Sequence, residues 1–129
     1  MRIIFWPDES EDQTKGGGPV RKFLKDLRKH QPKLLAFVWK TFKKVEKSPN
    51  LSDLERQKWV QRLQNVPERI YEFRIPPTQR GGVVRIYFAY KPNDPDTIIL
   101  LSAEKKQGTS HANREKTQQA IERFRKMMK

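Results

Sequence analysis

Two runs decide the fold of this chain: Ile70-Tyr71-Glu72-Phe73-Arg74-Ile75 and Val83-Val84-Arg85-Ile86-Tyr87-Phe88-Ala89-Tyr90. Both are largely apolar or aromatic with charges at alternate positions, and Gly81-Gly82 marks a turn between them. Because a strand sends alternate side chains to opposite faces, we expect a β-hairpin with one hydrophobic face. The other face would carry Glu72, Arg74, Arg85 and Tyr87.

A hairpin register that aligns the apolar residues places Ile75 opposite Val84 and Arg74 opposite Arg85. Facing like charges destabilise a sheet unless something compensates them. Two adjacent guanidiniums also present planar forks of donors that suit a phosphate group. Alternatively, Glu72 pairs with one arginine and the pattern is only a solvated charged face. The hairpin residues leave both interpretations open.

The charge balance indicates an anionic partner. Across 129 residues, 28 Lys and Arg side chains stand against 15 Asp and Glu side chains, a net charge of +13. Nucleic acid is the commonest partner of such a chain, and an acidic protein is the alternative. The length suits a single domain, residues 1–129.

Several protein classes are disfavoured by what the sequence lacks. It has no cysteine, which excludes disulfides, thiolate catalysis and thiolate metal sites and is compatible with the cytoplasm. The N-terminal apolar run is too short for a signal peptide. No run approaches the roughly 18 apolar residues of a membrane span. We therefore expect a cytoplasmic protein that does not enter a membrane.

The segments before the hairpin are expected to be mainly helical. The predicted elements are an edge strand at Ile3–Trp6, a flexible loop at residues 8–18, and helices at residues 19–29, 32–48 and 52–67. Ser52 and Glu55 have the spacing of a capping box at the start of the third helix. Phe37 and Trp39 lie off the apolar stripe of the second helix, so they either pack on the first helix or form a surface for a partner.

The segments after the hairpin complete the expected architecture. Thr97–Ala103 is an apolar run typical of a central strand, and a helix with an apolar stripe starts near Asn113. Helices and strands are grouped along the chain rather than alternating. This order predicts an α+β fold, with a mainly antiparallel sheet of about four strands, N-terminal helices and a C-terminal helix packed on it.

Candidate groups for chemistry follow the third strand. Lys105 and Lys106 lie where it leaves the sheet, and His111 lies in the polar loop beyond. Histidine is the usual side chain for proton transfer near neutral pH, although a loop histidine is more often simply exposed. The sequence has no His, Asp and Glu cluster at metal-ligand spacing and no phosphate-binding glycine loop, so we expect neither a metal nor a cofactor. RNA cleavage needs none, because the 2′-hydroxyl can attack and cations can stabilise the phosphorus centre.

The order of these motifs resembles the RelE/HigB toxin superfamily, and above all its phage-derived HigB-like branch. In that branch a tyrosine-glutamate-x-arginine strand, a valine-arginine strand and an aliphatic strand ending in paired lysines recur in this order. The resemblance covers about residues 19–123, including the opening Pro19–Leu24. It implies a toxin of a type II toxin–antitoxin pair with a RelE-like fold, which cleaves mRNA without metal at the ribosome. Its partners would be mRNA, the ribosome and a cognate helix-turn-helix antitoxin.

The resemblance also implies roles for individual residues. Arg74 and Arg85 match the basic residues of the family's strands, and Lys105 or Lys106 matches the basic residue at a strand end. Tyr71 and Tyr87 would stack on a base.

The resemblance does not by itself identify the side chain that transfers protons. An arginine side chain is effectively always protonated in proteins and so cannot act as a general base, which leaves Glu72 as the better candidate beside Arg74. His111 is the alternative proton carrier, although the family pattern has no fixed equivalent of it. Glu104 departs from the pattern, because the branch usually has an aromatic residue there.

Two other functions are compatible with the same residues. A related branch of the same fold poisons DNA gyrase rather than cutting RNA. A non-catalytic module that binds nucleic acid or an acidic protein is the second alternative. The paired basic residues favour RNA over gyrase.

Overall fold

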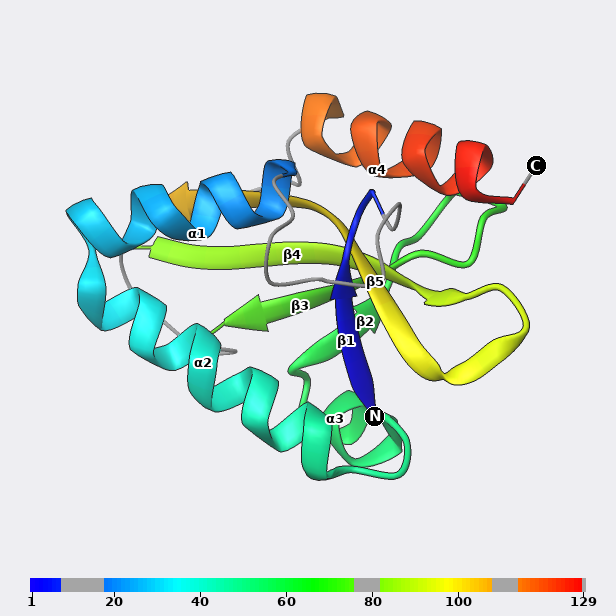
Figure 1. Cartoon of the computed structure of the whole chain (residues 1–129), viewed down its shortest axis with the longest axis horizontal. Coiled ribbons are helices and arrows are strands. Elements are labelled where there is room, and N and C mark those ends of the chain that lie inside the picture. The colour runs from blue at the N-terminus through cyan, green and yellow to red at the C-terminus, as the bar shows by residue number, and fades with distance from the viewer. Residues whose placement is uncertain (8–17, 76–81, 108–113, 129) are drawn as a thin grey trace.

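The computed structural model describes residues 1–7, 18–75, 82–107 and 114–128 and shows an α+β fold built on one five-stranded mixed sheet (Figure 1). In chain order the elements are β1 (Arg2–Phe5), α1 (Pro19–His30), α2 (Pro32–Lys47), α3 (Ser52–Arg56), β2 (Val60–Arg62), β3 (Tyr71–Ile75), β4 (Gly82–Lys91), β5 (Asp94–Gln107) and α4 (Arg114–Met127). The predicted loop at residues 8–18 lies, apart from Gly18, outside the described residues. The same holds for the predicted turn at Gly81 and for His111.

The sheet has the order β1-β5-β4-β3-β2, and three of its four pairings are antiparallel. β1 is an edge strand, as predicted, but it runs parallel to β5, so the sheet is mixed. A parallel pair needs a long connection. Here that connection contains every other element before β5. The fifth strand is β2, which lies where a helix was predicted, so the predicted sheet of four strands is corrected to five.

The predicted third helix is wrong over most of its length. α3 ends at Arg56, and Lys58 has a φ of 65°, a left-handed conformation in which a helix does not continue. Residues Val60–Arg62 form β2 and pair antiparallel with β3. Val60 is buried opposite Phe73, so its apolar side chain packs in the sheet core rather than on a helix stripe.

The predicted capping box is also absent. The N-cap of α3 is Leu51, and no side chain caps the helix. The backbone N–H of Ser52 instead donates to Asn50 Oδ1 at 3.0 Å. Ser52 is thus already helical, and Glu55 lies at N4, one residue beyond the N3 position that the motif requires.

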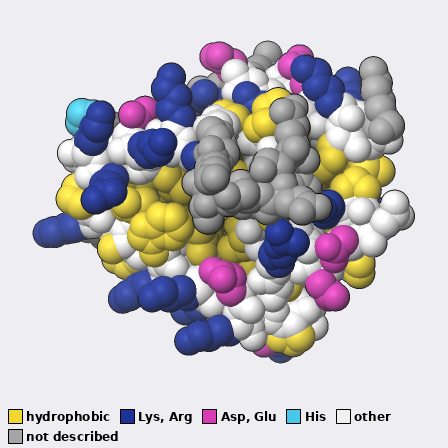
Figure 2. Space-filling view, viewed as in Figure 1, with side chains coloured by type: hydrophobic (Ala, Val, Ile, Leu, Met, Phe, Trp, Pro, Cys, Tyr) yellow, Lys and Arg dark blue, Asp and Glu magenta, His cyan; other side chains and the backbone are white. Residues whose placement is uncertain are grey.

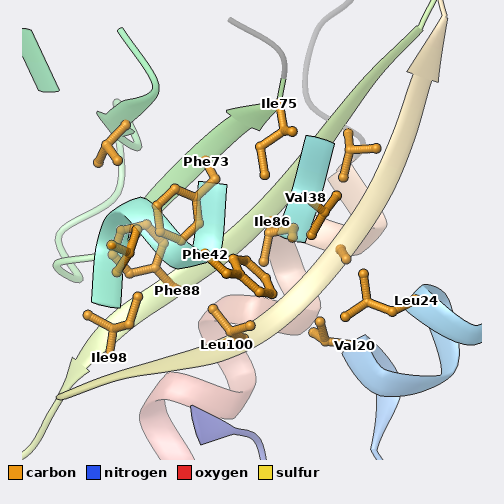
Figure 3. Packing of buried hydrophobic residues seen from close by; sticks show 14 of the residues in the cluster. Val20, Leu24, Val38, Phe42, Phe73, Ile75, Ile86, Phe88, Ile98 and Leu100 are labelled. Carbon is orange, nitrogen blue, oxygen red and sulfur yellow. The ribbon is translucent and has the colours of Figure 1, made fainter. Parts of the chain in front are cut away.

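Helices cover both faces of the sheet. α1 and α2, both predicted as helices, pack on one face through buried apolar residues: Val20, Leu24, Leu27, Leu35, Val38, Phe42 and Val45. Under them Phe73 stacks on Phe88, with ring centroids 4.3 Å apart, and Phe42 approaches Phe73 from α2 (Figure 3). α4 packs on the other face through Ala120 and Ile121. We call these the α1–α2 face and the α4 face.

Gly18 brings α1 close to the end of β1. Its φ of 111° is in the region that favours glycine, and a Cβ added there would lie 2.5 Å from the carbonyl oxygen of Trp6. Pro19 then occupies the first turn of α1, where its missing N–H costs no hydrogen bond. Over the described part of the chain, none of the helices combines the length and apolar character that a bilayer crossing requires.

Candidate functional site

The hairpin register is confirmed: β3 and β4 pair with Ile75 opposite Val84 and Arg74 opposite Arg85. β5 extends the pattern, because Ser102 lies opposite Tyr87 and Glu104 lies opposite Arg85. Two rows of polar side chains therefore cross three strands on one face. Together with Lys106, two residues beyond Glu104, we call them the polar cluster: Glu72, Arg74, Arg85, Tyr87, Ser102, Glu104 and Lys106.

The polar cluster is not the solvated charged face that its pattern allows. It lies on the α4 face, and Tyr87 belongs to the same buried group as Ala120 and Ile121 of α4. Glu72, Arg85 and Glu104 are about 95% buried. Arg74, with 35% of its side chain exposed, and Lys106, with 18%, are the accessible members among the charged residues. Charges buried to this degree need partners of opposite sign.

Two ion pairs supply part of that compensation. Arg74 Nε donates to Glu72 Oε1 at 3.0 Å, and Lys106 Nζ lies 3.6 Å from Glu104 Oε1. Glu72 therefore pairs with an arginine, as one of the two interpretations expected. Three cations and two carboxylates leave the cluster with one positive charge in excess, 3 − 2 = +1. The excess suits an anionic group at its accessible edge.

The sequence alone did not predict a role for Glu104 in the polar cluster. It lies directly opposite Arg85, where it supplies the negative charge that the facing arginines require. The signal was present in the sequence, because Ser102, Glu104 and Lys106 alternate along one strand. Such residues share a face, and the hairpin register determines which face.

Tyr87 is fully buried at the centre of the polar cluster. Burial raises the pKa of its hydroxyl above the usual value, Glu104 and Glu72 raise it further, and Thr117 and Arg85 act in the opposite sense. Tyr87 is thus a neutral phenol at physiological pH. The ring presents no free face to a base in this structure, which argues against the stacking role that the resemblance implied.

Tyr71 and Lys105 lie on the α1–α2 face, opposite the polar cluster. Tyr71 pairs with Phe88 and stacks on it, with ring centroids 5.6 Å apart. Lys105 pairs with Val84, one residue out of phase with Lys106. The structure thus brings Glu72, Arg74, Arg85 and Lys106 together and separates Tyr71 and Lys105 from them. His111 lies outside the described residues.

A cleft of about 420 Å³ adjoins the polar cluster. It lies between α1, β5 and α4 and shares Ser102 and Glu104 with the cluster. We call it the cationic cleft, because four cations and two carboxylates line it: Lys22, Lys105, Lys116, Arg123, Asp26 and Glu104. Lys105 therefore still contributes its charge here, from the β5 edge.

Arg123 is held in the cationic cleft by fixed contacts. Its Nη1 donates to the Leu101 carbonyl oxygen at 2.5 Å, and its guanidinium lies 5.0 Å from the Trp6 ring centroid. Burial lowers its pKa, with Glu122 opposing the shift. Sequence reasoning missed Arg123 and Lys116, although their seven-residue spacing on one helix placed them on a common side.

The described residues contain no group of three or more His, Asp and Glu side chains arranged to hold a metal ion. Comparison with known proteins finds no family model, no curated protein and no solved structure that matches this chain.

Proposed function

We propose that this chain is an endoribonuclease that cleaves mRNA at the ribosome without a metal ion, as the toxin of a type II toxin–antitoxin pair. A cognate helix-turn-helix antitoxin would neutralise it. The observation that carries the proposal is the side-by-side placement of Arg74 and Arg85 in a cluster with excess positive charge. The cationic cleft beside that cluster gives an RNA backbone a place to lie.

The accessible edge of the polar cluster suggests how a phosphate would bind. Arg74 is the more exposed of the two arginines, and its Nε is held by Glu72. A phosphate group that takes Glu72's place as partner of Arg74 frees the carboxylate for proton transfer. Lys106, also partly exposed, approaches the same phosphate from β5.

The proposed reaction is transesterification within the RNA. The 2′-oxygen forms a bond to the adjacent phosphorus while the bond from phosphorus to the 5′-oxygen breaks. Glu72 accepts the 2′-hydroxyl proton, and His111 is the proposed donor to the leaving 5′-oxygen. Arg74, Arg85 and Lys106 stabilise the charge that develops on the phosphorus oxygens. The products are a 2′,3′-cyclic phosphate and a 5′-hydroxyl, and no oxidant or co-reactant is required.

Expression in bacteria without an antitoxin tests the proposal. We expect growth arrest with cleaved mRNA, and restored growth and intact mRNA with Arg74→Ala. Arg62→Ala, which removes an exposed arginine on β2, should leave both effects in place. Arg85→Ala should also relieve the arrest. Because Arg85 is buried and Arg74 is the ion-pair partner of the buried Glu72, both variants are interpreted only if their folding is intact.

The same experiment distinguishes the two alternatives. Gyrase-dependent DNA breaks with intact mRNA would indicate a gyrase poison. Salt-sensitive RNA retention without cleavage products, in the presence of ribosomes, would indicate a non-catalytic binding module. Either outcome would contradict the nuclease proposal.

A further inference from the structure

A second concave surface lies on the other side of α1. It has a volume of about 310 Å³ and is bounded by α1, α2 and the end of β1. We call it the α1–α2 groove, and its lining residues are Phe5, Arg21, Leu24, Lys25, Arg28, Leu35 and Trp39. In Figure 2 hydrophobic side chains gather over the α1–α2 hairpin, with Lys and Arg side chains around them.

The floor of the α1–α2 groove is apolar. Leu24 and Leu35 belong to the hydrophobic core, and Phe5 packs against it. Trp39 meets the buried Phe42 edge-on, with ring centroids 5.7 Å apart, yet it remains 46% exposed. A large aromatic side chain that is anchored to the core but exposed beside other apolar groups is typical of an interaction site.

The rim of the α1–α2 groove is cationic. Arg21, Lys25 and Arg28 follow one another at i, i+4 and i+7 on α1, which spans about 10 Å along the helix. The Arg21 guanidinium lies over the Phe5 ring, 4.1 Å from its centroid, so a cation–π contact joins the rim to the floor. Among the described residues that line the groove, none is acidic.

We propose that the α1–α2 groove binds an acidic amphipathic helix of a protein partner. Apolar side chains at i, i+3 and i+4 of that helix would cover Trp39, Leu24 and Leu35, as in helix-in-groove recognition. Its Asp and Glu side chains would face the cationic rim over two turns, matching the spacing of Arg21 and Arg28. The exposed apolar floor and the cationic rim of the groove thus both favour an acidic amphipathic helix.

A polypeptide fits this groove better than RNA does. The floor combines aliphatic with aromatic side chains, which bury apolar side chains but leave the polar edges of a base unpaired. The groove also lies on the α1–α2 face, whereas the polar cluster lies on the α4 face. The inference therefore does not depend on the proposed nuclease activity, and both sites can be occupied together.

Selection from a displayed peptide library tests the inference. The library would contain random linear peptides of about 15 residues, long enough for four helical turns. We expect enriched binders with acidic residues and an apolar i, i+3, i+4 pattern. Their affinity should fall at least about tenfold with Trp39→Ala and, separately, with the double reversal Lys25→Glu/Arg28→Glu.

Matched variants on α2 serve as controls. Phe37 is the other exposed aromatic on that helix, at 43%, and does not line the groove, so Phe37→Ala should retain binding. Lys40→Glu/Lys47→Glu changes the net charge equally at exposed positions and should weaken binding much less than the rim reversal. Arg74→Ala should bind normally, which separates this test from that of the nuclease proposal. Thermal unfolding would verify that each variant is folded.

Four outcomes would overturn the inference. One is the absence of any enriched acidic amphipathic sequence. Another is binding that the Trp39 and rim variants leave unchanged. In the third, a short oligouridylate displaces the selected peptides from wild-type protein but not from Arg74→Ala protein, whose groove is intact. The peptides would then bind at the polar cluster, where the RNA competes with them. Displacement from both proteins would show that the groove takes RNA and would equally reject a protein occupant.

Discussion

At the scale of single residues, the buried charges of the polar cluster are compensated by opposite charges on the same and neighbouring strands of the sheet. Arg85 is buried opposite Arg74, and Glu104 occupies the third position of that row. Removing one partner from a buried set of charges costs more than the set contributes, because the remaining charge stays desolvated. Glu104 is therefore expected to be a stabilising residue rather than a participant in phosphate binding.

Glu104→Gln tests that role. The substitution keeps the shape but removes the negative charge beside Arg85 and Lys106, and we expect a loss of about 3 kcal/mol in the free energy of unfolding. The measurement is denaturant unfolding at neutral pH. Glu122→Gln, at an exposed position on α4, should change stability by less than about 0.5 kcal/mol. Equal stability of the two variants would refute the compensating role of Glu104.

At the scale of elements, α4 is fastened to the sheet by a contact near its C-terminus. Arg125 Nη2 lies 2.8 Å from Glu68 Oε1, on the segment that leads into β3. The pKa of Glu68 is lowered, first by a hydrogen bond from its own backbone N–H and then by Arg125. The contact holds the end of α4 over the face that contains Tyr87.

This contact predicts a pH dependence. Because the Glu68 carboxyl has a lower pKa in the folded state than its ordinary value of 4.5, the contribution is present above that value and is lost as pH falls through the folded pKa. Glu68→Gln should thus be less stable than wild type at pH 7, and the difference should shrink below pH 4.5. Unfolding curves across this range measure it. A difference that does not vary with pH would contradict the assignment.

The same scale shows what the sequence could and could not predict. The apolar sets of β3 and β4 coincide when Ile75 pairs with Val84, and a one-residue slip would separate them, so the Arg74–Arg85 pairing could be predicted. β2 could not be predicted, because it has only three residues. The alternation of apolar and polar residues that marks a strand is too short there to outweigh the helical spacing of apolar residues that starts at Leu54. The burial of the polar cluster depends on where α4 packs, and no local pattern in the strands encodes that.

At the scale of the whole molecule, α1 separates two surfaces of different character. The cationic cleft lies on one side of it and the α1–α2 groove on the other. Both draw on the net charge of +13, but the cleft has polar walls whereas the groove has an apolar floor. This division supports separate sites for nucleic acid and for a protein partner.

The salt dependence of RNA binding tests the role of the cationic cleft. Each phosphate contact on a single strand contributes about 0.7 to the slope of log affinity against log salt concentration. Lys116→Ala should reduce that slope by about this amount, whereas Lys40→Ala, on the exposed side of α2, should leave it unchanged. Fluorescence anisotropy with a labelled oligonucleotide at several salt concentrations gives the slopes. Identical slopes for the two variants would exclude the cleft as the RNA path.

Cleavage of a defined RNA by purified protein, in EDTA without ribosomes and in magnesium buffer with ribosomes, tests the central claim most directly. We predict products that end in a 2′,3′-cyclic phosphate, and a rate that Arg74→Ala lowers by about 10²- to 10³-fold while Arg62→Ala leaves it unchanged. A single 2′-deoxynucleotide at the cleaved position should abolish the products. No cleavage by the wild-type protein in either condition, or cleavage that Arg74→Ala does not slow, would contradict the account.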